Sequence, residues 1–471
     1  MKQQNKNFLF NVGYQFVMYL FPLISAAYIS RVIGAAVLGQ YSFVNSVATI
    51  CGMFGLLGIS NYGNREIAKV KDDYQARSTV FSKIYSLQLM FTGVTCGIYV
   101  FVLLLFSVPN IKLYVIELVY LLSVAFDVTW LFFGLEQFKT TLLRNLIFKS
   151  ISTIAVFLFV HTPNDIYIYA AIIATSTLAS QIYLFCLGRK QVAFSLVINR
   201  GQIEHFKKCL VLFIPVIAFG LYRTMDKAMI GIMSTPESLS FYEYAERVIL
   251  IPIMVINALG TVMMPHMAYV MSNDAEGKAK YREIIAFSMK LLLTFAAFAC
   301  MGLIIWAEEI VVVLFGSEFV QSRVLVQLLA PTILASSWAN VIRTQYLIPK
   351  GCDAIYVRST VIGLTINLLA NLLLIRIVGA AGACIGTIFA ECAIAIYQSI
   401  KVSQHIESRK YGMYLIAGLI KAATCLVLTW GLVMRIDHYI LRLVIAICAS
   451  CVLFVVSNWK MVIIEFLGIK H

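Results

Sequence analysis

The sequence predicts an all-α polytopic membrane protein with about 14 transmembrane helices. The first observation is composition: 61% of the 471 residues are hydrophobic and only 13% are charged, whereas soluble domains carry about 25% charged residues. The second is that apolar runs of about 20 residues, each long enough to cross a bilayer, recur along the whole chain. The third is that most lysines and arginines lie in short loops between these runs. No stretch is left for a soluble domain of useful size.

The predicted spans follow one another with short connections. They are Phe8–Ser30, Leu38–Ser60, Phe81–Phe106, Leu113–Gly134, Leu143–Val160, Tyr167–Leu187, Leu210–Ile232, Phe241–Met271, Ile285–Trp306, Val324–Leu347, Val357–Ile377, Ala381–Ile400, Met413–Met434 and Ile440–Val462. An even number of spans returns the C-terminus to the side of the N-terminus.

Basic residues in alternate loops predict the orientation. The loops Gly63–Lys83 and Gly188–Lys208 are rich in lysine and arginine, whereas Ser234–Ser240 has neither. About 26 of the 37 basic residues fall on one side, and the positive-inside rule makes that side cytoplasmic. Both termini are therefore expected in the cytoplasm. The net charge of +14 does not indicate nucleic-acid binding, because that would require the basic residues to gather on one folded surface.

The chain contains a repeat. Phe21-Pro22 is followed by Leu38–Phe43, and about 200 residues later Ile214-Pro215 is followed by the similar stretch Leu239–Tyr244. Parallel six-helix repeats are typical of transporters, in which the substrate path lies between the halves. We predict two pseudo-symmetric six-helix lobes and two additional C-terminal helices, at residues 1–205, 206–402 and 403–471.

Charged residues inside the predicted spans indicate a binding site. Each costs about 2.5–3.5 kcal/mol on insertion scales, so such residues usually face a cavity or a partner. Arg223, Asp226 and Lys227, for example, share one face of the seventh span. The excess of cations predicts an aqueous cavity for an anion, and arginine suits phosphate. The candidate substrate-binding residues are Asn11, Tyr14, Arg31, Arg223, Asp226, Lys227, Arg247, Arg343 and Lys421.

A structural interpretation stays open for each of these residues. Arg223 and Asp226 can form an ion pair, and Arg31 and Arg343 can extend to a membrane interface.

Two carboxylates are candidates for ion coupling. Asp127 and Glu391 lie mid-span with no cation within a helical turn, so burial favours their neutral form. Asp226, between two cations, is expected to stay ionised. Coupling to protons, to sodium or to the membrane potential all stay open, and neither a cofactor nor a metal site is expected.

No enzyme motif is present. The sequence lacks H-E-x-x-H, G-x-x-x-x-G-K-[ST] and G-x-S-x-G. We therefore expect a transporter rather than an enzyme.

Several stretches resemble Wzx-type (RfbX-like) O-antigen and polysaccharide repeat-unit flippases. These belong to the polysaccharide transport family of the multidrug/oligosaccharidyl-lipid/polysaccharide (MOP) superfamily, which includes MATE exporters and peptidoglycan-precursor flippases. The resemblance covers essentially the whole chain. The stretches that carry it are Phe21–Ile24, Tyr28–Gly34, Leu38–Phe43, Leu57–Ala68, Asp226–Gly231 and Leu314–Phe319.

This resemblance implies a MATE-like fold and a lipid-linked substrate. An undecaprenyl-pyrophosphate oligosaccharide, of O-antigen or capsule type, would pass from the inner to the outer leaflet of the bacterial inner (cytoplasmic) membrane by alternating access. The helices after Met413 resemble those that line a groove for the polyprenyl tail, where Lys421 would meet the head group. A polysaccharide polymerase and a chain-length regulator are the protein partners that it implies.

Two alternatives stay open. A cation-coupled multidrug or small-molecule exporter of the same superfamily would be expected to have an acidic cavity, which the basic excess disfavours. A membrane-embedded polysaccharide polymerase or ligase would be expected to have a large outer loop. The longest outer segment here is about Ala307–Arg323.

Overall fold

The computed structural model describes residues 18, 20–197, 202–271, 275–404, 407–436 and 438–459. All regular secondary structure in these residues is helical, and eleven of their helices are long and apolar enough to cross a membrane. A helix satisfies its own backbone hydrogen bonds, which lipid cannot do. The protein is therefore an all-helical, multi-span membrane protein, and this prediction is confirmed.

The described residues form two compact units that divide between Ser240 and Phe241. We call them the N-terminal unit and the C-terminal unit. The helix Gln202–Met233, which holds the seventh predicted span, belongs by its contacts to the N-terminal unit. The division into two six-helix repeats concerns similarity within the sequence rather than packing, and it stays a prediction.

In the N-terminal unit, α2 is the central helix and packs against α4, α5 and α9. Helix α5 also packs on α8, and α8 on α7. A core of buried aromatic and aliphatic residues, including Tyr62, Phe81 and Trp130, joins α3, α4 and α6. The helices are Leu20–Ile33, α2 (Ala35–Leu56), α3 (Ile59–Lys69), α4 (Tyr74–Leu105), α5 (Ile111–Ala125), α6 (Thr129–Gly134), α7 (Phe138–Phe159), α8 (Ile166–Gly188) and α9 (Gln202–Met233).

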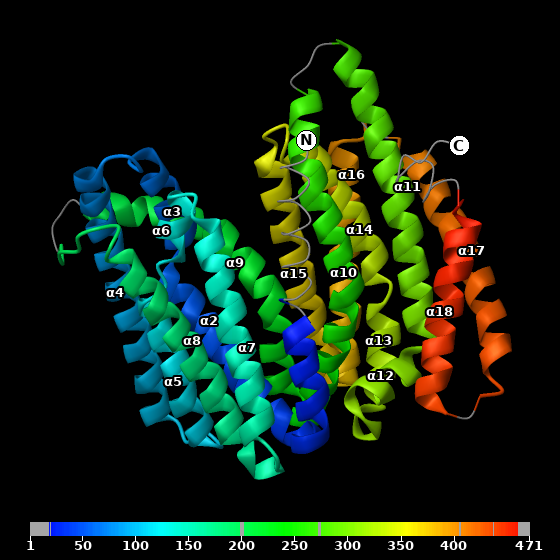
Figure 1. Cartoon of the computed structure of the whole chain (residues 1–471), viewed down its shortest axis with the longest axis horizontal. Coiled ribbons are helices and arrows are strands. Elements are labelled where there is room, and N and C mark those ends of the chain that lie inside the picture. Colours follow the sequence, from blue (N-terminus) through cyan, green and yellow to red (C-terminus); the bar gives the residue numbers. More distant parts are fainter. Residues whose placement is uncertain are drawn as a thin grey trace. The chain divides into compact units, whose positions relative to one another are not determined.

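In the C-terminal unit, α15 packs along α16, and α11 packs against both α14 and α17. The last two helices, α17 and α18, are drawn in orange to red in Figure 1 and pack on each other beside α11. The helices are α10 (Pro236–Met271, which begins before the unit boundary), α11 (Ala275–Ile305), α12 (Ala307–Phe315), α13 (Ser322–Leu329), α14 (Thr332–Ile342), a π-helix (Arg343–Leu347), α15 (Asp353–Val378), α16 (Ala380–Lys401), α17 (Ser408–Val433) and α18 (Tyr439–Ser457).

The predicted spans correspond closely to these helices. Every span from the second to the fourteenth coincides with a described helix or helix pair. The helix Leu20–Ile33 overlaps the end of the first span, whose beginning lies outside the described residues. Three spans predicted as continuous are interrupted: the second between α2 and α3, the fourth between α5 and α6, and the tenth between α13 and α14. The tenth breaks at Pro331, which lacks the N–H that a helix needs.

The second span bends where α2 meets α3. Gly58 adopts φ +74°, in the left-handed region that glycine enters without steric cost. A Cβ atom at this position would lie 2.7 Å from the Cys209 carbonyl oxygen of α9. Glycine therefore permits both the bend and the close approach of α9.

Large apolar side chains cover the outer faces of the spans. Leu104 of α4 and Ile377 of α15 are 81% and 76% exposed. A soluble monomer rarely exposes contiguous apolar surface on this scale, whereas lipid tails solvate it. These faces are the surfaces that meet the bilayer.

Candidate functional site

A cavity of about 540 Å³ lies among α11, α17 and the end of α18 in the C-terminal unit. Lys290 of α11 and Lys421 of α17 contribute two ammonium groups to its wall. The other lining residues are Thr294, Tyr414, Ala417, Gly418, Val456, Ser457, Asn458 and Trp459. Among the described residues that line it, none is acidic, so the cavity is positively charged.

Helical spacing brings the α17 residues to this cavity. Tyr414, Gly418 and Lys421 stand at i, i+4 and i+7, on one face of the helix. Gly418 also sets the distance to α11, because a Cβ atom there would lie 3.2 Å from Thr294 Cα and 3.4 Å from Ala297 Cβ. A larger residue at 418 would push α17 away from α11 and open the wall.

The end of α18 holds the Lys421 side chain in place. The Lys421 ammonium group donates a hydrogen bond to Asn458 Oδ1 at 3.3 Å. Asn458 is itself oriented because its Nδ2 donates to the Phe454 carbonyl at 3.0 Å. The Phe454 ring packs against Phe298 of α11 with centroids 4.6 Å apart. All three helices thus contribute to the position of this cation.

The chemistry of the wall suits an anion. A lysine ammonium group is a compact positive charge with three donors, which can bind a phosphate oxygen. The neutral Asn458 partner does not neutralise that charge. Because the cavity lies between helices apolar enough to span a membrane, an anionic group carried on a lipid is the ligand class that it fits.

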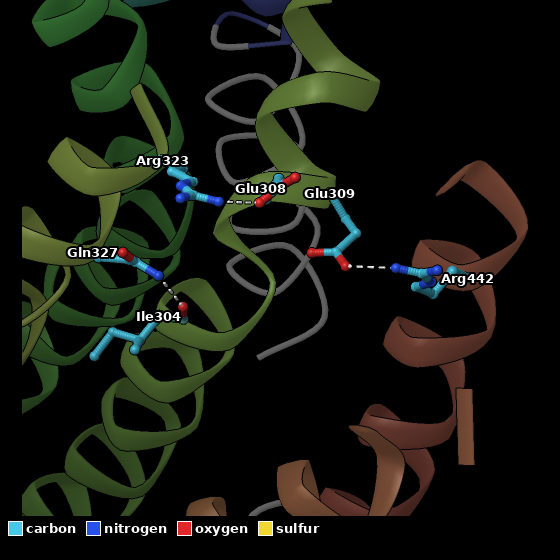
Figure 2. Close-up of polar contacts among 6 residues, drawn as sticks. All are labelled: Ile304, Glu308, Glu309, Arg323, Gln327 and Arg442. Atoms are coloured by element: carbon cyan, nitrogen blue, oxygen red, sulfur yellow. Dashed lines mark hydrogen bonds and ion pairs between the residues drawn. The ribbon is translucent and has the colours of Figure 1, made fainter. Parts of the chain in front are cut away.

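One ion pair holds α18 near its other end, as Figure 2 shows. Glu308 and Glu309 are adjacent on α12, and their side chains point to different helices. Glu308 pairs with Arg323 of α13, and Glu309 Oε1 lies 3.4 Å from Arg442 Nη1 of α18. Gln327 of α13 donates to the Ile304 carbonyl at 2.9 Å. The short helix α12 therefore connects α18 to α13, and Gln327 connects α13 to α11.

Three predicted binding arginines have local partners. Arg31 is exposed and donates to the Ala27 carbonyl at 2.6 Å. Arg247 of α10 forms an ion pair with Glu243 at 2.6 Å. Arg343 lies at the start of the π-helix, 5.6 Å from the centre of the Tyr356 ring.

The seventh-span group is only partly described. Asp226 is buried in α9 and Lys227 is half-buried, and both have interaction partners. Arg223 lies on the same helix, but its side chain is outside the described part of the structure. Asn11 and Tyr14 lie outside the described residues altogether. A common anion cavity for all the predicted residues stays a prediction.

The two predicted coupling carboxylates both accept hydrogen bonds. Asp127 lies in the break between α5 and α6, where its Oδ1 accepts from the Thr129 N–H at 3.0 Å. Glu391 of α16 accepts from the Ser336 hydroxyl at 2.8 Å. The first contact, from a side chain to the N–H two residues on, is an Asx turn.

Sequence reasoning missed two ionisable residues. Lys290 follows the basic stretch that leads into the ninth predicted span, and α11, which begins at Ala275, places it well inside a helix. Glu117 was absorbed into the apolar run of the fourth span, although a carboxylate four residues into such a run is itself a signal. The structure buries Glu117 to 1% exposure.

Solved structures with a similar fold are membrane transporters. The lipid II flippase MurJ in its inward closed conformation is 14% identical, with a TM-score of 0.74 over 95% of this chain and 98% of that one. The MATE transporter VcmN of Vibrio cholerae, solved as a point mutant, is 14% identical with a TM-score of 0.55 over 87% and 98%. The chain thus has the MurJ/MATE-like transporter fold.

The family model for polysaccharide biosynthesis proteins matches residues 5–271, and that for the lipid II flippase MurJ matches residues 142–450. The chain belongs to the polysaccharide biosynthesis protein family, whose O-antigen transporters are members of the MOP superfamily. These are transporters and flippases rather than enzymes. The predicted family and the prediction of a transporter rather than an enzyme are therefore both confirmed.

Curated relatives agree with this family. A protein of Shigella dysenteriae, provisionally named an O-antigen transporter, is 20% identical over 80% of this chain and 95% of its own length. The probable low-salt glycan biosynthesis flippase Agl15 of Haloferax volcanii is 27% identical over 52% of this chain. That second match spans 53% of the relative, about half of its length.

Proposed function

We propose that this protein carries undecaprenyl-pyrophosphate-linked oligosaccharide repeat units, of O-antigen or capsule type, from the inner to the outer leaflet of the bacterial cytoplasmic membrane. The observation that carries the proposal is the cavity with Lys290 and Lys421, which offers two cations to a phosphate group between membrane-spanning helices. Relatives named as glycan flippases and O-antigen transporters support a lipid-linked glycan as the substrate.

The basic loops support the direction of entry. By the positive-inside rule, both termini and the loop before α11 face the cytoplasm. Lys290 and Lys421 then lie toward the cytoplasmic leaflet, where the repeat unit is made. The diphosphate would bind there first and then move through alternating access of the two halves.

The test is complementation of a gene deletion in the protein's own host. Surface polysaccharide and lipid-linked repeat units are measured together in strains that carry wild type, Lys421→Met, Lys290→Met or Lys410→Met. Lys410 is the matched control because it lies on the same helix but pairs with Glu407 outside the cavity. A charge-assisted hydrogen bond is worth about 1.5–3 kcal/mol, which corresponds to about a 10- to 100-fold loss of affinity.

The expected result is that the deletion strain lacks surface glycan and accumulates repeat units in the cytoplasmic leaflet. Lys421→Met should then restore much less surface glycan than Lys410→Met at equal protein levels. Normal surface glycan with increased sensitivity to cationic drugs would overturn the proposal in favour of a multidrug exporter. Repeat units that reach the outer leaflet but are not polymerised would indicate a polymerase or ligase.

A further inference from the structure

Glu117 is a carboxylate buried inside the N-terminal unit. It lies on α5, which packs against α2, α4 and α8, and only 1% of it is exposed. Its Oε1 accepts a hydrogen bond from the Asn45 amide of α2 at 3.4 Å, and the Tyr41 hydroxyl also contacts the carboxyl group. Its Oε2 has no hydrogen-bond partner among the described residues. The group is therefore enclosed, but only one of its oxygens is satisfied.

The helices around Glu117 provide no positive charge near it. The residues of α2 and α8 include no lysine, arginine or histidine. Lys112 of α5 lies over the Tyr167 ring at 5.7 Å, and Arg77 of α4 donates to the Gln191 carbonyl at 2.7 Å. Tyr99 is the α4 residue whose hydroxyl donates to the Tyr114 carbonyl of α5, near Glu117. Lys83 lies roughly four helical turns before Tyr99 on α4 and is therefore far from Glu117.

The other titratable groups on these helices are neutral phenols and thiols. They are Tyr41 and Cys51 on α2, Tyr74, Tyr85, Cys96 and Tyr99 on α4, Tyr114 and Tyr120 on α5, and Tyr167, Tyr169, Tyr183 and Cys186 on α8. Asp127, just beyond α5, is acidic and would add repulsion to a second negative charge. None of these groups can compensate an ionised Glu117.

An ionised carboxylate buried without a counter-charge is strongly disfavoured, and such a group takes up a proton instead. A metal cation is a poor alternative, because it needs several oxygen ligands. The described residues contain no group of three or more histidine, cysteine or acidic side chains placed to hold a metal ion. The ligand that fits this site is a proton.

We propose that Glu117 is a proton-binding site through which this transporter couples substrate movement to proton movement. The proposal rests on the transport function proposed above. In the conformation described, the carboxyl group holds the proton. When helix movement admits water, the O–H bond breaks, its electron pair stays on the carboxylate, and the proton passes to water.

Glu117 fits this role better than the two carboxylates predicted from the sequence. Asp127 already accepts a hydrogen bond from the Thr129 N–H at the start of α6. Glu391 is partly exposed and accepts a hydroxyl hydrogen bond. Only Glu117 combines near-complete burial with an oxygen that lacks a partner among the described residues.

The test is infrared difference spectroscopy of the full-length protein in lipid vesicles across a pH series. Wild type should show the carbonyl band of a protonated carboxylic acid, which disappears as pH rises. Glu117→Gln should lose this band. Glu309→Gln is the matched control, because Glu309 is also buried but is paired with Arg442, and this variant should keep the band. Glu117→Asp retains a carboxyl group and should show a shifted band, which separates a missing group from a misfolded protein.

Two results would overturn the proposal. One is a titrating band that persists in Glu117→Gln, and the other is a band that responds to sodium at constant pH instead of to pH. The deletion host adds a functional readout, in which surface glycan restored by Glu117→Gln should lose the pH dependence seen with wild type. Unchanged pH dependence would refute coupling through Glu117. If the deletion strain had normal surface glycan, the transport proposal would fail while the spectroscopic result would still stand.

Discussion

The two units each bury a glutamate, and the surroundings of these residues differ in one respect. Glu117 in the N-terminal unit is 1% exposed and has an amide and a hydroxyl as neighbours. Glu309 in the C-terminal unit is 8% exposed and faces Arg442 at 3.4 Å (Figure 2). Burial alone therefore does not decide what a carboxylate does. The ion pair with Arg442 gives Glu309 a structural role, whereas no described cation pairs with Glu117, for which we propose proton exchange.

The largest effect is expected from removal of the counter-charge at Glu309. Arg442→Met leaves that carboxylate buried without its cation, and breaking a buried pair in this way costs about 3–5 kcal/mol. Thermal unfolding of the purified protein would measure the loss. Arg435→Met, which changes an exposed arginine next to α17, is the control. If the double variant Glu309→Gln, Arg442→Met were as unstable as Arg442→Met, the unpaired charge would not be the cause.

A smaller loss is expected where a neutral side chain satisfies several buried groups. The Gln88 amide nitrogen donates to the carbonyls of Val124 and Asp127, and its oxygen accepts from Trp130 Nε1. Gln88→Leu leaves these groups unsatisfied, at a cost of about 2–3 kcal/mol. The same unfolding measurement would test this, with the exposed Gln75→Leu on α4 as the control. Equal stability of the two variants would show that water replaces the amide.

Asp127 extends the comparison to a carboxylate that bonds to backbone. Asp127→Ala removes the acceptor for the Thr129 N–H and should cost about 1 kcal/mol, as does the loss of one hydrogen bond. Asp127→Asn keeps an acceptor oxygen and should be nearly as stable as wild type. A transport defect in Asp127→Asn, at unchanged stability, would instead support the role in ion coupling predicted from the sequence.

The smallest effect on stability is expected at Glu117 itself. If its carboxyl group is neutral, glutamine replaces it without a change of charge and should cost less than about 1 kcal/mol. Unfolding of Glu117→Gln beside Arg442→Met gives the direct comparison. A large destabilisation by Glu117→Gln would mean that the carboxylate is ionised and held by a partner, as Glu309 is.

Several features of the fold were predictable because the membrane restricts what a chain can do. Lipid requires closed backbone hydrogen bonding and apolar surfaces, so the length and hydropathy of each run located the spans. The charge on Lys421 inside the thirteenth span was a signal of the same kind, and the structure places it on a cavity wall. The expected roles of Arg223, Asn11 and Tyr14 stay predictions, because these side chains lie outside the described structure.

The break in the fourth span, between α5 and α6, could not be predicted from the sequence. No glycine or proline marks residues 125–129, so the sequence predicts one continuous span there. Where the helix ends at Ala125, Gln88 from α4 accepts from the Trp130 indole Nε1–H and donates to the carbonyls of Val124 and Asp127. Because Gln88 is 36 residues from Val124 in the sequence, its hydrogen bond produces no pattern in the residues around the break.

The sequence by itself determined the helical membrane architecture, the positions of the spans and the excess of basic residues, because each depends on local hydropathy and charge. Tertiary structure alone decided which ionisable groups have charged partners. It brought Lys290 beside Lys421, placed Arg442 beside Glu309 and left Glu117 Oε2 without a hydrogen-bond partner among the described residues. The physical reason is that the charge state and the role of a buried group depend on the atoms within a few ångströms of it, and in a helical bundle most of these belong to other helices.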